Sequence, residues 1–170
     1  MTALSIRYLA DHPEAAPFLG AWFAREWGDG SEERTAAGYA GQVSHAASAD
    51  RLPICLVGLL GVEPVATATL KFREIEYSPE ADFWLGWVCV REDMRGRGFG
   101  KALVGAVEAQ AVARGMARLY LHTPTREAFY LQLGWRTLGP TTADGRPSTV
   151  MTKAFNGAGQ AAQSRARQSP

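Results

Sequence analysis

One seven-residue segment has the residue types and spacing to bind a phosphate or a diphosphate. Its residues are Arg95, Gly96, Arg97, Gly98, Phe99, Gly100 and Lys101. Glycine at every second position lets the backbone approach a ligand closely and turn successive N–H groups into one concavity. An apolar stripe that follows predicts a helix beginning near Gly98, so these N–H groups lie at a positive helix N-terminus. The spacing fits neither a Walker loop nor a dinucleotide fingerprint.

The overall charge restricts the partners of the chain. The 170 residues carry 18 Lys and Arg against 17 Asp and Glu, a net charge of +1, so anion recognition must be local and we expect no nucleic-acid partner. No apolar run approaches the roughly 20 residues of a membrane span, and no secretory leader begins the sequence. We therefore expect a cytoplasmic protein without a membrane partner. Cys55 and Cys89 lie in apolar runs, which predicts two buried thiols and, with three scattered histidines, no metal site.

The glycine-spaced segment must be positioned by a regular set of elements. Periodicity predicts strands at 5–9, 52–60, 65–72, 82–90, 119–122, 135–138 and 149–155. It predicts helices at 11–27, 31–43, 98–114 and 125–133, with Asp11, Ser31 and Thr125 as N-caps. Gly86, in the middle of a strand, indicates a β-bulge or a close backbone approach.

This order of elements predicts an α/β (α+β) fold with one mixed, mostly antiparallel central sheet and helices on both faces. Helical spacing in 11–27 predicts that Phe18, Leu19, Trp22 and Phe23 are buried. We expect one domain over 1–155. The remainder, 156–170, has no large apolar residue and is expected to be a disordered tail.

Two motifs resemble those of a known family. The segment from Arg95 to Gly100 resembles the acetyl-CoA loop of the Gcn5-related N-acetyltransferases (GNAT), with its consensus Arg/Gln-Gly-x-Gly-x-Gly/Ala. The segment from Phe129 to Trp135 resembles the family's Phe/Tyr-Tyr-x-x-x-Gly-Phe/Trp motif, and 148–153 resembles its closing strand. The resemblance covers about residues 4–155, and the part from Phe99 to Trp135 also resembles acetyltransferases that modify protein N-termini, including the actin-modifying branch.

The resemblance implies the GNAT fold and a set of cofactor-binding residues. The backbone of Val88, Cys89 and Val90 would bind the pantetheine arm of acetyl-CoA as an added strand would. The seven residues from Arg95 to Lys101 would hold its pyrophosphate. Tyr130 matches the general acid that protonates the departing CoA thiolate, a role that suits a phenol.

The chain departs from the family at the general base. A carboxylate on strand 82–90 often serves there, but the matching position falls near Gly86. We take Asp82 as the first candidate, beside the acidic residues Glu74, Glu76 and Glu80 that could also act as base or attract a cationic amine. His122, at the end of strand 119–122, could serve as base or contact the acceptor, because imidazole takes up protons near neutral pH.

The acceptor is expected to carry an ammonium group. In this family the first two helices and the loop before the bulged strand line the acceptor pocket, which here offers aromatic and acidic side chains suited to a cation. We expect contacts from Trp27, Glu76, Trp84 and His122.

The resemblance implies an acyltransferase that moves the acetyl group of acetyl-CoA to a primary amine, either a small molecule or a peptide N-terminus, by direct attack. No metal is required. The missing carboxylate at Gly86 leaves one alternative open, a non-catalytic acetyl-CoA sensor on the same fold. The family often dimerises, so a homodimer also stays open.

Overall fold

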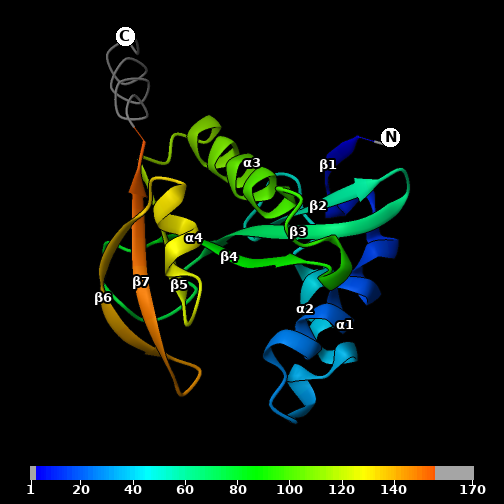
Figure 1. The fold of residues 1–170 in the computed structure, drawn as a ribbon, viewed down its shortest axis with the longest axis horizontal. Helices are drawn as coiled ribbons and strands as arrows, with labels where there is room; N and C mark the ends of the chain where they lie inside the picture. The colour runs from blue at the N-terminus through cyan, green and yellow to red at the C-terminus, as the bar shows by residue number, and fades with distance from the viewer. Residues whose placement is uncertain (1–2, 156–170) are drawn as a thin grey trace, which may run out of the picture. The chain divides into compact units, whose positions relative to one another are not determined.

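The computed structural model describes residues 3–155, and its seven strands form one sheet in the order β1-β2-β3-β4-β5-β7-β6 (Figure 1). The predicted α/β class and mixed sheet are confirmed. The described residues fall into two compact units, 3–71 with 87–107 and 72–86 with 108–155. The predicted single domain over 1–155 stays a prediction, and the predicted tail at 156–170 lies outside the described residues. No helix within 3–155 has both the length and the apolar character that crossing a membrane requires.

The first helix begins later than its sequence pattern predicts. After β1 (Leu4–Tyr8), two short 3-10 turns over Leu9–Asp11 and Pro13–Ala15 precede α1 (Ala16–Trp27). Asp11 is therefore not its N-cap, because Pro13 and Pro17 remove backbone donors and keep the entry in 3-10 turns. Leu19 and Phe23 are buried as predicted, whereas Phe18 is 55% exposed and does not belong to the core.

The second helix is also capped further along the chain. A 3-10 turn at Glu32–Arg34 precedes α2 (Ala36–His45), and the Thr35 hydroxyl accepts a hydrogen bond from the Gly38 N–H at 3.1 Å. Ser31, the predicted cap, instead donates its hydroxyl and its backbone N–H to the Asp29 carboxylate. The helix itself is confirmed, and Tyr39 and Val43 bury its apolar side.

The predicted hairpin forms from β2 (Ile54–Leu60) and β3 (Glu63–Phe72), which pair in antiparallel register. Cys55, Val57 and Leu59 pack in one cluster with α1 and α2. Gly58 points to the other face, where an added Cβ would lie 3.0 Å from the Leu103 side chain of α3. Since successive side chains of a strand alternate between faces, α1 and α2 lie on one face and the first half of α3 on the other.

Strand β4 and helix α3 lie on either side of the glycine-spaced segment in the chain. Strand β4 (Phe83–Val90) leads through a 3-10 turn at Glu92–Met94 into α3 (Phe99–Ala113). Trp87 in β4 has φ +51°, so the predicted irregularity of this strand is present one residue after Gly86. A left-handed conformation at a bulky residue is rare and strained, which is typical of functional sites.

The second unit builds a hairpin beside a short helix. Strand β5 (Arg118–Thr123) meets β4 in parallel at Tyr120 and Trp84 and pairs antiparallel with β7 (Arg146–Ala154). Strand β6 (Arg136–Ala143) pairs with the other edge of β7. Between β5 and β6 lies α4 (Glu127–Gln132), shorter than predicted. Thr125 does not cap it; the Thr123 hydroxyl accepts a hydrogen bond from the Arg126 N–H instead.

Candidate active site

The glycine-spaced segment, predicted to form an N–H concavity, leads into the start of α3 with two of its glycines in the left-handed conformation. Gly96 has φ +76° and Gly98 has φ +81°, conformations that favour glycine, and a Cβ at either position would meet no atom within 4 Å. The backbone conformation therefore requires these glycines, and packing does not. The Ala102 N–H donates to the Gly98 carbonyl at 3.0 Å, so the N–H groups just after Gly98 precede the intrahelical ladder. A helix of fifteen residues gives them a positive end that suits a phosphate.

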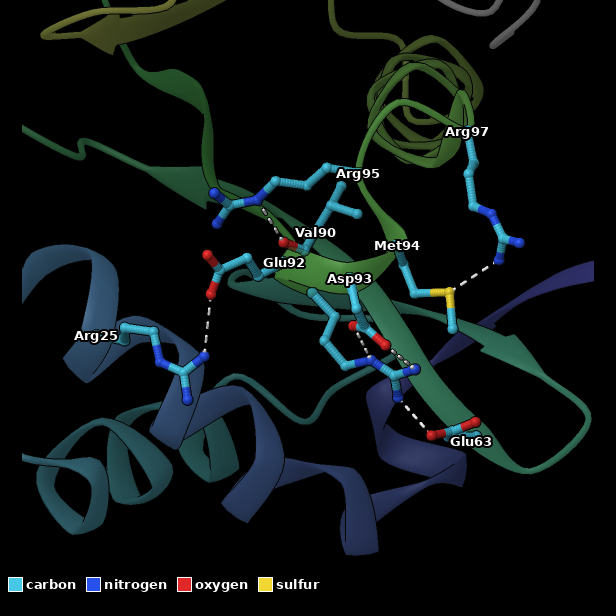
Figure 2. A network of polar contacts seen from close by, with 9 residues as sticks. Arg25, Glu63, Val90, Glu92, Asp93, Met94, Arg95 and Arg97 are labelled. Carbon is cyan, nitrogen blue, oxygen red and sulfur yellow. Dashed lines mark hydrogen bonds and ion pairs between the residues drawn. The ribbon is translucent and has the colours of Figure 1, made fainter.

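The two arginines of this segment are directed to different partners. Arg95 donates its Nε hydrogen to the Val90 carbonyl at 3.2 Å and forms an ion pair with Glu26 of α1. Arg97 donates to the Met94 sulfur at 3.0 Å, on the other side of the segment (Figure 2). Both side chains were predicted to hold a pyrophosphate. In this structure the Arg95 side chain is bound to α1 and β4, whereas the hydrogen bond of Arg97 goes to Met94, directly before the segment.

Ion pairs hold the turn that presents the concavity. Arg91 pairs with Glu63 at the start of β3 and donates to both carboxylate oxygens of Asp93 (Figure 2). These hydrogen bonds hold the pKa of Asp93 below its ordinary value. Arg25 of α1 pairs with Glu92 at 3.4 Å. Single exposed pairs contribute little, but a network from three elements fixes the geometry of a turn better than one pair does.

The second half of β4 carries the backbone predicted to bind pantetheine. Val88 and Val90 are half-buried, and Cys89 is 5% exposed. Burial, with a smaller contribution from the Glu26 carboxylate, raises the pKa of the Cys89 thiol to about 12. Burial also raises the pKa of Cys55. Both cysteines are buried as predicted, and at neutral pH neither is the thiolate that nucleophilic catalysis needs.

Aromatic rings gather between α1 and β4. The Phe23 ring lies 5.0 Å from that of Trp27 and 5.4 Å from that of Trp87. Trp27, predicted to contact the acceptor, is half-buried at the end of α1. Trp87 was not singled out from the sequence, although Gly86 beside it was. The available signal was Gly86, because a glycine inside a strand often marks an irregularity that re-aims the side chain after it.

Tyr130, the predicted general acid, lies on α4 and is 7% exposed. Its ring packs edge-on against Phe129 at 5.0 Å and Trp135 at 6.1 Å. Burial raises the pKa of its phenol above the ordinary value, and the nearby Arg126 opposes that shift weakly. The phenol therefore keeps its proton throughout the neutral and mildly alkaline range, as a proton donor must.

A polar network of side chains from α3, β7 and the segment after α4 holds the end of α4 in place. Glu108 accepts a hydrogen bond from the Trp135 indole at 2.9 Å and pairs with Lys153 at 2.7 Å. Lys153 also donates to the Leu133 carbonyl at 2.7 Å, just beyond the end of α4. The network was not predicted from the sequence, and it holds the motif in which Tyr130 lies.

The remaining predicted site residues lie in different environments. Asp82 accepts a hydrogen bond from Arg73 Nε at 2.9 Å, so its carboxylate belongs to an ion pair. Trp84 is fully buried and donates its indole N–H to the Ala81 carbonyl at 2.6 Å, as a core residue does. His122 is half-buried, with Nδ1 3.2 Å from the Ser148 hydroxyl. Glu76 is exposed in the loop before β4.

Side chains that could ligate a metal ion do not gather at one place in the part of the chain that the structure describes. No group of three or more His, Cys, Asp or Glu side chains there is arranged to hold a metal ion.

Comparison with known proteins identifies the family. The sequence model of the acetyltransferase (GNAT) family matches residues 14–135. Over 118 residues, 64% of this chain, the sequence is 33% identical to N-alpha-acetyltransferase 80 of Mus musculus. The match covers 37% of that mouse protein, so the chain spans well under half of its relative's length.

Solved structures support the same assignment. A candidate N-acetyltransferase of Lactobacillus plantarum is 27% identical, with a TM-score of 0.66 over 89% of this chain and 98% of its own. An aminoglycoside 6'-N-acetyltransferase crystallised with coenzyme A shares the fold at 17% identity, with a TM-score of 0.68 over 88% of this chain and 96% of its own. The chain therefore belongs to the GNAT family of acetyltransferases.

Proposed function

We propose that this chain transfers the acetyl group of acetyl-CoA to a primary amine, either a small molecule or a peptide N-terminus, by direct attack of the amine. The observation that carries the proposal is the left-handed backbone of Gly96 and Gly98 directly before the N-terminus of α3, which suits the predicted N–H concavity. Its open space and its left-handed glycines fit a diphosphate, which is the anionic group of acetyl-CoA. The name of the mouse relative supports an amine as acceptor.

The residues present fit the cofactor. The N–H groups of the concavity would hold the diphosphate, with Arg97 and Lys101 adding positive charge. The backbone of Val88, Cys89 and Val90 would bind the pantetheine arm, and the Val90 carbonyl also accepts a hydrogen bond from Arg95. Acetyl-CoA supplies the thioester carbonyl that the amine attacks.

Two proton transfers remain for the side chains. Tyr130 donates its proton to the CoA sulfur as the carbon–sulfur bond breaks, for which its buried, protonated phenol is suited. The ammonium of the acceptor must lose a proton before it attacks. Asp82 and His122 stay the candidates for this step, Asp82 through a carboxylate that is shared with Arg73 and His122 through its imidazole.

The test is a thiol-release assay with acetyl-CoA and an acceptor panel of amino acids, polyamines, aminoglycosides and peptides. The proposal predicts that at least one amine releases thiol and is acetylated, and that acetyl-CoA binds in calorimetry without any amine. Binding without turnover on the whole panel favours the alternative, an acetyl-CoA sensor on the same fold. That alternative rests on Gly86 at the usual place of the base and on the ion-paired state of Asp82.

A further inference from the structure

An ammonium group already rests on an aromatic ring beside the proposed pantetheine strand. The Nζ atom of Lys71, the penultimate residue of β3, lies 3.6 Å from the centroid of the Trp87 ring. That distance is typical of a cation–π interaction, in which the negative face of the ring attracts the charge. Indole is the strongest of the aromatic side chains in this respect.

The backbone conformation of Trp87 and its contacts with α1 together fix the direction of its ring. The Phe23 ring lies 5.4 Å away, and Trp87 packs against the buried cluster that also contains Leu19 and Tyr39. Its backbone is left-handed, with φ +51°, in the middle of β4. A bulky residue keeps such a conformation only where its surroundings enforce it, so the direction of the ring is built into the fold.

The position of Trp87 connects it to the reaction. It directly precedes Val88, the first of the residues to which the proposed function assigns the pantetheine arm. The residue that carries the ring and the backbone that would bind the arm are therefore neighbours in the same strand. The neighbouring thiol of Cys55 is neutral, because burial raises its pKa despite the charge of Lys71, so the described groups around the ring include no thiolate to compete for a cation.

We propose that the face of Trp87 is the ammonium-binding element of the acceptor site and that Lys71 occupies it in the free protein as an internal competitor. The inference rests on the proposed function for its link to catalysis, whereas cation binding to the ring is testable without turnover. An arriving cationic acceptor displaces the Lys71 ammonium and takes its place on the ring. Lys71 thereby lowers the apparent affinity for every cationic acceptor and does not affect neutral ligands.

The test uses tetramethylammonium, which binds aromatic faces and cannot be acetylated, and its neutral isostere tert-butyl alcohol. The indole N–H signals of the five tryptophans are recorded by NMR in the full chain, and Trp87→Phe identifies the signal of Trp87. We expect tetramethylammonium to shift that signal, with an apparent Kd about three- to tenfold lower in Lys71→Met than in the wild type. Lys71→Arg keeps a cation on the ring and should stay near the wild type, and tert-butyl alcohol should shift nothing in any variant.

Kinetics then link the ring to the acceptor. With any cationic amine that the wild type acetylates, Lys71→Met should lower KM for the amine by a similar factor at unchanged kcat, and Trp87→Leu should raise it. Retained acetyl-CoA binding shows that each variant is folded. The inference is overturned if the Trp87 signal does not respond in Lys71→Met, or if Lys71→Met raises KM. Absence of turnover on every amine, with the NMR response intact, would instead count against the proposed function alone.

Discussion

Glu26 of α1 and Arg95 of the glycine-spaced segment form an ion pair, and the same guanidinium donates its Nε hydrogen to the Val90 carbonyl. Three parts of the chain, the helix, the end of β4 and the turn, thus meet at one side chain. That Arg95 touches the pyrophosphate stays a prediction. In this structure its side chain joins the turn to α1 and to the end of β4, so we propose that it also positions the turn.

The Glu26–Arg95 ion pair and the hydrogen bond from Arg95 to Val90 are together called the clamp. Its loss is predicted to weaken acetyl-CoA binding selectively. Glu26→Gln removes the charge that holds Arg95, so the turn loses its fixed geometry and KM for acetyl-CoA should rise about five- to tenfold at nearly unchanged kcat. The matched control is Glu14→Gln, which removes the exposed carboxylate beside His12, outside the turn, and should change KM less than twofold. Steady-state kinetics with a saturating amine measure KM for acetyl-CoA in both variants. Equal changes in KM would show that the clamp does not position the turn.

Gly98→Ala tests the concavity itself. A Cβ fits sterically, but φ +81° is strained for alanine by about 1–2 kcal/mol, so folding stability should fall by about that amount and acetyl-CoA affinity at least tenfold. Gly105→Ala in α3, also with open space around its Cβ, should gain up to about 1 kcal/mol and bind normally. Denaturant unfolding and calorimetry measure both effects. Normal binding by Gly98→Ala would exclude the concavity as the diphosphate site.

Tyr130→Phe tests the general acid. The change keeps the packing of the ring, so stability should alter by less than about 1.5 kcal/mol while kcat falls about 10²- to 10⁴-fold. Because burial raises the pKa of the phenol, wild-type kcat should show no loss from Tyr130 ionisation up to about pH 10. Acetyl-CoA affinity serves as the control and should be unchanged. A variant with wild-type kcat would remove Tyr130 from the reaction.

The network that joins Glu108, Trp135 and Lys153 predicts a loss of folding stability when Glu108 is removed. This loss includes the segment from Phe129 to Trp135, in which Tyr130 lies. Glu108→Ala leaves the Lys153 ammonium and the Trp135 indole without their shared acceptor, which should cost about 2–4 kcal/mol. Glu127→Ala in the same unit breaks the exposed bond from Thr137 and should cost less than about 1 kcal/mol. Urea unfolding of the two variants measures the difference, and similar midpoints would show that the network contributes no more than an exposed bond.

Cys89 predicts how stability depends on alkaline pH. Its pKa of about 12 in the folded chain exceeds the value of about 8.5 for a free cysteine, so the unfolded chain loses this proton first as the pH rises. Its contribution to stability is intact below about pH 8 and is lost between about pH 9 and 12, by at most about 1.4 kcal/mol per pH unit. Cys89→Ala should therefore make the decline in unfolding free energy over pH 9–11 shallower. An unchanged slope would show that the thiol titrates alike in both states.

Most of the fold can be predicted from the sequence, because hydrophobic periodicity and the positions of the glycines indicate where strands, helices and turns form. The hairpin of β2 and β3, the entry into α3 at Gly98 and the burial of both cysteines all follow from such patterns. Helix starts were less accurate. Asp11 and Ser31 have the right chemistry for a cap, but proline-containing 3-10 turns and the competing Thr35 decide where α1 and α2 begin.

The site was harder to predict because its side chains are set by contacts distant in sequence. Neither Glu26 as the partner of Arg95 nor Lys71 as the neighbour of Trp87 can be read from local spacing. The left-handed backbone of Trp87 also interrupts the alternation by which side chains of β4 would be assigned to a face. The tryptophan of β4 chosen from the sequence, Trp84, lies in the core, and the partly buried Trp87 was missed.

The most direct test of the central claim is the stoichiometry of one reaction mixture that contains the purified chain, acetyl-CoA and an amine of the panel. We predict that free CoA thiol and N-acetylated amine appear in equal amounts, the first measured by its absorbance with a thiol reagent and the second by mass spectrometry. A mixture in which millimolar acetyl-CoA neither binds in calorimetry nor loses its acetyl group to any amine would contradict the account.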